Sequence, residues 1–342
     1  MNIVVLAGGT STERDVSLVS GKMVYKALKE NGHKCLLLDV FLGLETDDID
    51  SVFERGDELL GNIEDIKNTN PDIEAVKALR PDGDKNFFGP NVIDICRKAD
   101  VVFMALHGEN GENGKVQAAF DLFGIRYTGT DYVSSALSMD KALAKEIMIY
   151  HGISTPKGFS LKKDEEDKNT VEYPSVVKVT TGGSSVGVYL VNNKEEYEQA
   201  KKDAFAFGDE VVVEQFIKGR EFSCGVIAGK ALPVIEIVPK VGFYDYKNKY
   251  QAGSTEEFCP AHVDEETTLR MQKMAEDVFK ALRLCQYARI DIMMNEKNEI
   301  FALEANTLPG MTPTSLMPQE ANAMGINYNA LCEKLINLAM EK

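Results

Sequence analysis

Two stretches near the C-terminal end of the sequence carry polar side chains at alternate positions. Arg289 is two residues before Asp291, and Glu304 is two residues before Asn306. The apolar residues around each pair predict a strand, and alternate residues of a strand share one face. On neighbouring strands, these residues bring two carboxylates, an amide and a guanidinium together on one surface. Such oxygen donors suit Mg²⁺ held between protein and phosphate, and the arginine suits developing negative charge. The alternative is a surface hairpin with ordinary ion pairs.

A loop rich in glycine and serine, residues 182–187, offers backbone amides and hydroxyls without bulky side chains, as an anion-binding loop needs. The apolar stretches on either side predict a hairpin that covers phosphate. Lys178 and Lys141 are candidate phosphate ligands. An ordinary hairpin turn with solvated lysines explains the same pattern. The segment Val211–Ile217 passes from apolar to polar residues, which suits either an adenine site or a simple strand end.

Two further polar residues follow predicted strands. Glu13 comes after the first glycine turn, at the start of a helix, where a carboxylate either caps the helix or holds a substrate ammonium. His107 begins a glycine-rich loop at a strand end, where open α/β sheets place ligands. We expect it to be exposed enough to contact substrate, and a structural hydrogen bond is the alternative.

Several other kinds of site are excluded by what the sequence lacks. It contains no Gly-x-Ser-x-Gly elbow and no Walker loop, which excludes the usual patterns of serine hydrolysis and P-loop chemistry. The six cysteines have neither metal-site nor disulfide-framework spacing, so we expect reduced thiols and a cytoplasmic protein. The N-terminus has no secretion-signal pattern, and no apolar run is long enough for a membrane helix.

The pattern of apolar residues predicts three α/β units. Strand Ile3–Leu6, a helix over residues 16–28 and strand Lys34–Val40 form a parallel unit, to which residues 100–106 add a buried strand. A second unit starts near residue 140 and contains the glycine-serine hairpin. A third unit has strands over 221–227, 232–238, 287–294 and 299–305, a helix over 265–284 and a closing amphipathic helix over 327–340.

Charge and length restrict the functions further. The 342 residues include 38 Lys and Arg against 54 Asp and Glu, a formal net charge of −16. This balance argues against binding to nucleic acid or to anionic membranes. Nine acidic residues against one arginine lie between positions 44 and 66, which we interpret as a solvated acidic insertion.

Six motifs, in this order, resemble those of the D-alanine–D-alanine ligases of the ATP-grasp superfamily, and the resemblance covers the chain apart from residues 44–89. The motifs are Gly8–Ser17, His107–Gly114, Ser135–Lys141, Gly183–Gly187, Tyr244–Tyr250 and the most specific one, Leu303–Leu316. The resemblance implies a three-domain ATP-grasp architecture of the α/β class. Its parts are a Rossmann-like substrate domain (1–128, with the acidic insertion near 44–89), a central ATP-grasp domain (129–220) and a C-terminal ATP-grasp catalytic domain (221–342).

The resemblance also implies a role for individual residues. For ATP, the matching residues are Lys141 and Lys178 at the phosphates and Glu214, Gln215, Ile217 and Glu221 around adenine and ribose. For two Mg²⁺ ions, or Mn²⁺ in their place, they are Asp291, Glu304 and Asn306. For the first D-alanine they are Glu13 with His107 nearby; for the second, Ser315 and Leu316. For loop closure they are Ser184, Lys249 and Tyr250, and for the oxyanion Arg289 and the Gly310 amide.

The implied reaction joins two D-alanines through an acyl phosphate at the expense of ATP, in the cytoplasm, for peptidoglycan synthesis; the family's usual state is a homodimer. Two alternatives remain. A family member that uses D-serine or D-lactate as the second substrate shares most of these motifs, although Tyr250 favours the dipeptide. A nucleotide-binding regulator without turnover would not need to keep Asp291, Glu304, Asn306 and Arg289 together.

Overall fold

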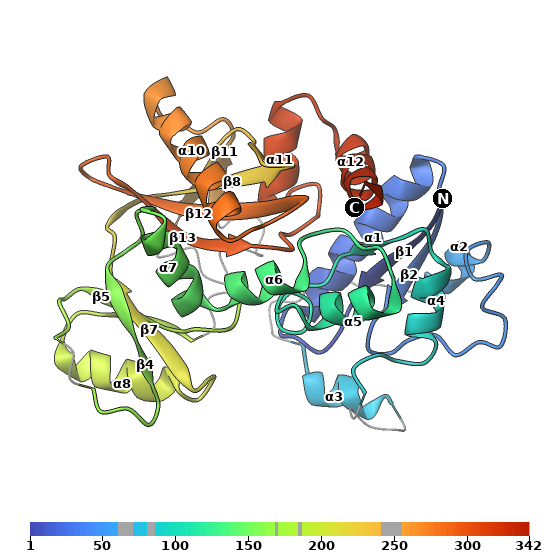
Figure 1. The fold of residues 1–342 in the computed structure, drawn as a ribbon, viewed down its shortest axis with the longest axis horizontal. Coiled ribbons are helices and arrows are strands. Elements are labelled where there is room, and N and C mark those ends of the chain that lie inside the picture. The colour runs from blue at the N-terminus through green and yellow to red at the C-terminus, as the bar shows by residue number, and fades with distance from the viewer. Residues whose placement is uncertain (61–70, 81–85, 168–169, 184–186, 241–254, 342) are drawn as a thin grey trace.

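The computed structural model describes residues 1–60, 71–80, 86–167, 170–183, 187–240 and 255–341. These described residues form three separate sheets, arranged along the long axis of the molecule in Figure 1. No helix in these described ranges is long and apolar enough to cross a bilayer.

The N-terminal sheet is parallel, with strand order β2-β1-β3. Its strands are β1 (Asn2–Ala7), β2 (Lys34–Asp39) and β3 (Val101–Met104). Successive β1 residues are buried on opposite faces, as strand geometry requires: Ile3 and Val5 join one apolar cluster, Val4 and Leu6 the other. The predicted parallel unit is therefore confirmed.

Helices cover both faces of this sheet. They are α1 (Arg14–Glu30), α2 (Gly56–Leu59), α4 (Val92–Lys98), α5 (Lys115–Phe123) and the C-terminal α12 (Tyr328–Met340). Helix α3 (Ile73–Ala78) has no buried residue and lies apart from the sheet in Figure 1. Helices α1 and α12 share one face, where Leu28 and Leu335 meet in the core, and α4 and α5 pack on the other. The two chain ends consequently lie close together in Figure 1.

The second sheet has four antiparallel strands in the order β4-β7-β5-β6. Its elements, with the helices that precede them, are α6 (Tyr132–Met139), α7 (Lys141–Tyr150), β4 (Gly158–Lys162), β5 (Ser175–Val179), β6 (Val188–Val191), α8 (Lys194–Ala204) and β7 (Glu210–Gln215). Strands β5 and β6 pair antiparallel, which confirms the predicted hairpin, and α8 covers one face of the sheet through Tyr197 and Ala200.

The third sheet is antiparallel, with order β11-β10-β8-β12-β13 and β9 paired to β8. Its strands and helices are β8 (Gly219–Ile227), β9 (Lys230–Ala231), β10 (Ile235–Pro239), β11 (Thr255–Phe258), α10 (Glu265–Ala281), β12 (Tyr287–Asn295), β13 (Ile300–Asn306) and α11 (Leu316–Ala323). Helix α10 covers one face through Met271 and Val278, and α11 packs on the other, where Leu316 contacts the Ile235–Ile237 region.

Several short elements lie outside the predicted ones. Helices α2 and α3 interrupt the acidic segment that we interpreted as an insertion. The elements α4, α5, α6, α8, α11, β4, β9 and β11 also went unpredicted. Most of these helices span between four and nine residues, too few to establish a clear 3.6-residue period. Packing against the sheets stabilises most of these helices, but α3 has no buried residue.

Candidate active site

Two cavities meet where the three sheets converge. The smaller, about 200 Å³, lies between the N-terminal loops and the third sheet, with Glu13, His107, Arg289 and Ser315 in its wall. The larger, about 710 Å³, lies between the second and third sheets. Its wall includes Lys178, Glu214, Gln215, Ile217, Glu221 and Asp291. Four residues belong to both walls: Lys141, Gly182, Gly183 and Glu304.

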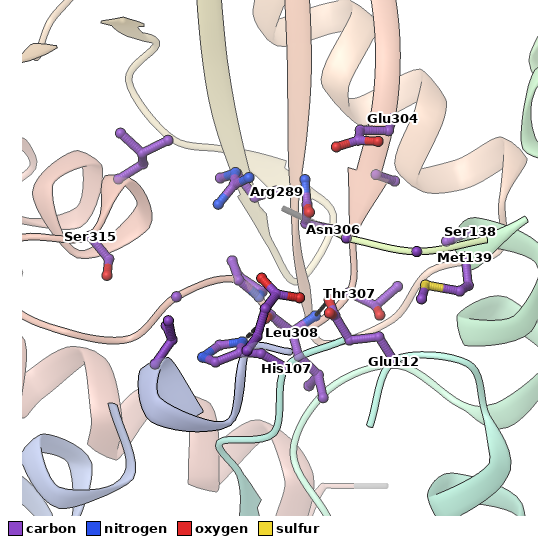
Figure 2. A pocket seen from close by; sticks show the side chains of 18 of the residues that line it. His107, Glu112, Ser138, Met139, Arg289, Glu304, Asn306, Thr307, Leu308 and Ser315 are labelled. Carbon is purple, nitrogen blue, oxygen red and sulfur yellow. Dashed lines mark hydrogen bonds between the residues drawn. The ribbon is translucent and has the colours of Figure 1, made fainter. Parts of the chain in front are cut away.

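The predicted polar face on β12 and β13 is present. Arg289 pairs across the strands with Asn306, and Asp291 pairs with Glu304, so all four side chains lie on one face. Figure 2 shows Arg289, Asn306 and Glu304 projecting from these strands into the small cavity. The surface hairpin is therefore the wrong alternative, because these residues line cavities and Asp291 is only 6% exposed.

The Asp291 carboxylate accepts four hydrogen bonds. Arg289 donates from Nε to one oxygen and from Nη2 to the other, each at 2.9 Å. Asn306 Nδ2 and Ser223 Oγ also donate, both at 2.9 Å. This network holds the carboxylate in the wall of the larger cavity, opposite Glu304 on the neighbouring strand.

The chemistry of the donor set fits a divalent cation that is shared with phosphate. Asp291, Glu304 and Asn306 supply hard oxygen atoms from adjacent strands. Within the described ranges, no group of three or more His, Cys, Asp or Glu side chains forms a metal site on its own. Two carboxylates and an amide leave coordination positions open, as Mg²⁺ bound to a nucleotide requires.

Two lysines share one carboxylate, Glu214, in the wall of the larger cavity. Lys178 and Lys145 both pair with Glu214, Lys145 at 2.6 Å, and Lys145 also donates to Thr155 Oγ1 at 2.7 Å. Burial opposes ionisation of Glu214, but the two ammonium groups outweigh it and hold the pKa of this carboxyl below its usual range. The Glu214 carboxylate therefore anchors the lysines, and it also lines the larger cavity together with Gln215, Ile217 and Glu221, the other residues that the resemblance places around adenine and ribose.

Lys141 connects the two cavities. It begins α7, its Nζ donates to Gly182 O at 2.8 Å, and it lies 3.7 Å from Glu304 Oε2. Its backbone N–H donates to Thr180 O at 2.9 Å. One lysine thus ties the glycine-serine hairpin of the second sheet to the polar face of the third.

Glu13 does not cap its helix. It occupies the N-cap position of α1 without a side-chain capping bond, so the capping alternative is wrong. Its carboxylate instead approaches the glycine loops: a Cβ added to Gly183 would lie 2.6 Å from Glu13 Oε2, and one added to Gly108 would lie 2.9 Å from it. Only residues without a side chain leave room for the carboxylate between these loops.

His107 is buried, not exposed, which corrects the sequence-based expectation. The side chain is 6% exposed, Nδ1 lies 3.0 Å from Leu308 O, and Nε2 lies 3.3 Å from Ser20 Oγ. Burial lowers the pKa of this imidazole, which keeps it neutral near pH 7. His107 thus joins the N-terminal loop to the chain segment that follows β13, while still contributing to the cavity wall.

Glu112 makes a second connection between the same loops. Its carboxylate accepts from Gly108 N at 2.6 Å and from Leu308 N at 3.4 Å (Figure 2). Burial, assisted by the negative charge of Glu13, raises the pKa of Glu112 to about 8. The backbone N–H and C=O of Leu308 are therefore both held by the N-terminal loop.

The segment after Leu308 completes the small cavity. Gly310 lies against Ser315, since an added Cβ would stand 3.0 Å from Ser315 Oγ. The Ser315 hydroxyl accepts from Thr312 N at 3.0 Å and pairs with Thr312 Oγ1 at 2.8 Å. Leu316, the first residue of α11, packs on the third sheet. Of the residues proposed from the sequence, Ser184, Lys249 and Tyr250 lie outside the described ranges.

Comparison with known proteins now identifies the family. The model of the D-Ala–D-Ala ligase N-terminus matches residues 2–130, and that of the D-Ala–D-Ala ligase C-terminus matches residues 147–337. The chain belongs to the D-alanine–D-alanine ligase family. This membership confirms the ATP-grasp fold class.

Individual ligases support this membership over the whole chain. The D-alanine–D-alanine ligase of Lacticaseibacillus casei is 46% identical, with 98% of this chain and 95% of the relative covered. The ligase of Bacillus anthracis complexed with ATP superposes with a TM-score of 0.74 at 30% identity, covering 100% and 98%. The VanG D-Ala:D-Ser ligase of Enterococcus faecalis gives 0.77 at 30% identity, covering 99% of each chain.

Three residues of this ligase-family site had no assigned role at the sequence level. Lys145 follows Lys141 by four positions on α7, a spacing that predicts the same helix face and offered a usable signal. Glu112 lies inside the His107–Gly114 motif, but its position there does not predict a contact with Leu308. Glu257 lines the small cavity from the edge strand β11, and nothing in its local sequence indicates this.

Proposed function

We propose that this chain joins two D-alanine molecules into D-alanyl-D-alanine, with conversion of ATP to ADP and phosphate, for peptidoglycan synthesis. The observation that carries the proposal is the junction of the two cavities at Lys141, Gly182, Gly183 and Glu304. The small cavity, whose wall offers Glu13 and Arg289 to a charged amino acid, opens at this point onto a cavity large enough for a nucleotide. Transfer of a phosphoryl group to a carboxylate needs this arrangement.

In this proposal the domains are residues 1–128, 129–220 and 221–342, with ATP between the second and third. Lys141 and Lys178 contact the phosphates, and Gln215, Ile217 and Glu221 surround the adenine and ribose. Glu214 belongs to the same site as the anchor of Lys178 and Lys145. Asp291, Glu304 and Asn306 would hold two Mg²⁺ ions, or Mn²⁺, which would neutralise the negative charge of the triphosphate.

Glu13 orients the first D-alanine by binding its ammonium group, and His107 fixes the adjoining loop. The D-alanine carboxylate then attacks the γ-phosphorus of ATP, which gives an acyl phosphate and ADP. Lys141 is well placed to contact the group in transfer, because its ammonium lies at the junction of the cavities.

The second D-alanine binds at Ser315 and Leu316, and its amine attacks the acyl carbonyl, which expels phosphate. Arg289 and the Gly310 amide stabilise the oxyanion of the tetrahedral intermediate. Family analogy assigns Ser184, Lys249 and Tyr250 to the closed state, with Lys249 near phosphate. Closure must exclude water, because an acyl phosphate hydrolyses readily.

The test is a coupled assay of ADP release with Mg²⁺, ATP and D-alanine, combined with mass spectrometry of the product. We expect ADP release that depends on D-alanine and yields the dipeptide in equal amount. ADP release at the same appreciable rate with and without amino acid would refute ligation. Negligible ADP release under both conditions would favour the nucleotide-binding regulator.

A D-alanine–D-serine ligase is the second candidate, because the VanG D-Ala:D-Ser ligase superposes on 99% of the chain. Equimolar D-alanine, D-serine and D-lactate in one reaction distinguish the products by mass. We expect mainly D-alanyl-D-alanine; preferential incorporation of D-serine or D-lactate would establish one of the alternative ligases.

We further propose a cytoplasmic homodimer. The six thiols are all free, which suits a reducing compartment that supplies ATP. Leu122 is 87% exposed, and Phe123, Tyr132 and Val133 of α5 and α6 are also exposed apolar residues, which suits an interface between two copies on these helices. Light scattering should give the dimer mass for the wild type and the monomer mass for Leu122→Asp; a dimeric variant would exclude this interface.

A further inference from the structure

Glu257 lies on the same sheet face as the residues of the proposed active site, although it belongs to the edge strand. Cross-strand partners share a face of a sheet. Glu257 is opposite Ile237, Ile237 is opposite Glu221, and Glu221 is opposite Met293. Met293 is two residues from Asp291 on β12, so Glu257 and Asp291 project to the same side.

The Glu257 carboxyl lines the small cavity beside helix α11. Gln319 Nε2 donates a hydrogen bond to Glu257 Oε2 and another to Thr314 O at 2.8 Å. Gln319 is four residues after Ser315, so the two residues share a helix face about one turn apart. Gln319 therefore links Glu257 to the segment next to Ser315, and Glu257 and Ser315 both line the small cavity. Ser315, which is assigned to the second amino acid, is labelled together with Arg289 in Figure 2.

The charge of Glu257 is incompletely compensated by its neighbours. Burial raises the pKa of this carboxyl, although the hydrogen bond from Gln319 and the positive charge of Arg289 act in the opposite direction. Arg289 itself is engaged with both oxygens of Asp291. A partly buried carboxylate in a cavity wall gains most from a cation that enters the cavity.

We propose that Glu257 binds the ammonium group of the second amino acid and thereby selects an amine over a hydroxy acid as acceptor. The assignment rests on the proposed ligase function. Ser315 and Leu316 hold the acceptor at the start of α11, and Glu257 adds a counter-charge to the same cavity wall from β11, beside Gln319 of that helix. Glu13 serves the first amino acid from the other side of the cavity, so each substrate has a carboxylate of its own.

The consequence for specificity follows from the chemistry of the two acceptors. D-alanine carries an ammonium group that neutralises Glu257, whereas D-lactate carries a hydroxyl that cannot. A site built around a charged hydrogen bond rejects an analogue that leaves its buried polar group without a partner.

The test is Glu257→Gln, which keeps the size and an acceptor for Gln319 but removes the charge. Dipeptide formation reports the acceptor, and trapping of the acyl phosphate by hydroxylamine reports the first amino acid. We expect the D-alanine concentration needed for dipeptide formation to rise about 10-fold or more. The D-alanine and ATP concentrations needed for hydroxamate formation should stay unchanged.

The matched control is Glu256→Gln, which removes the same charge from the exposed opposite face of β11. It should leave both assays unchanged. Glu257→Asp, which restores the charge, should recover much of the affinity for the acceptor D-alanine. When D-alanine and D-lactate compete as acceptors, Glu257→Gln should incorporate a larger share of D-lactate than the wild type does.

Three results would overturn the assignment. The first is an unchanged acceptor requirement in Glu257→Gln, and the second is an equal change in both assays. The third is an equal loss in Glu257→Asp and Glu257→Gln, which would show that Glu257 only packs against Gln319. A wild-type protein that forms neither hydroxamate nor dipeptide would refute the ligase function itself, and this assignment with it.

Discussion

Replacement of Glu320 by glutamine is expected to change how the stability of the protein depends on pH. Glu320, on α11, is 0% exposed, and it accepts a hydrogen bond from Gly225 N at 2.5 Å. Its second oxygen, Oε1, has no hydrogen-bond partner within the described part of the chain. The carboxyl fills the space left by the missing side chain of Gly225, where a Cβ would lie 2.5 Å from Oε2.

Burial raises the pKa of Glu320 from 4.5 to about 8, against the opposing effects of the Gly225 N–H and Arg289. Between these two values the folded protein keeps a proton that the unfolded chain releases, so stability must fall as pH rises. The slope is about 1.4 kcal/mol per pH unit. Relative to acid pH, the loss from this one group amounts to about 3 kcal/mol at pH 7 and about 4 kcal/mol at pH 8.

Glutamine has the shape of the protonated acid and does not titrate. The free energy of unfolding of Glu320→Gln relative to wild type should therefore increase steadily from pH 5 to pH 8. If the new amide group itself changes the free energy of unfolding, that change is the same at every pH and does not affect this slope. Urea unfolding of the nucleotide-free protein, followed by circular dichroism at pH 5, 6, 7 and 8, measures the difference.

Glu256→Gln, which removes one negative charge from an exposed position, is the control for general charge effects. A difference between Glu320→Gln and wild type that is constant with pH would refute the reasoning. So would a difference that decreases as pH rises, because it would mean that Glu320 is ionised and stabilised in the folded protein.

Three further predictions concern the site. Glu304→Ala should abolish D-alanine-dependent ADP release while circular dichroism stays unchanged; normal turnover would contradict the metal assignment. Lys145→Met should leave Glu214 with one lysine and raise the KM for ATP by about 10-fold, and an unchanged KM would show that Lys178 needs no such anchor. Gly183→Ala should place a Cβ against Glu13 and reduce hydroxamate formation by about 10-fold or more at subsaturating D-alanine, and wild-type rates would show that the loop adjusts freely.

Patterns of short range were sufficient to predict much of the fold. The alternation in residues 287–306 predicted two strands with Arg289, Asp291, Glu304 and Asn306 on one face, and the register of β12 and β13 confirms that face. The first parallel unit and the glycine-serine hairpin were predicted on similar grounds. Strand periodicity and turn chemistry are local properties, so they can be read from neighbouring residues.

Exposure of individual side chains was harder to predict. His107 was expected to be accessible and is buried against Leu308, and Glu13 proved not to cap α1. The sequence around His107 contains no sign of residue 308, because about two hundred positions separate the two. The partner of a polar side chain depends on contacts that form only when the sheets come together.

The amino-acid sequence by itself determined most of the strand segments, the polar face of β12 and β13 and the family motifs, since each depends on the spacing of neighbouring residues. The tertiary structure alone decided that Glu214 anchors two lysines, that Glu257 reaches the small cavity from an edge strand, and that Glu320 is buried behind Gly225. It also placed α12 on the N-terminal sheet. These features arise because burial and charge compensation depend on every chain segment that surrounds a group, whatever its distance along the sequence.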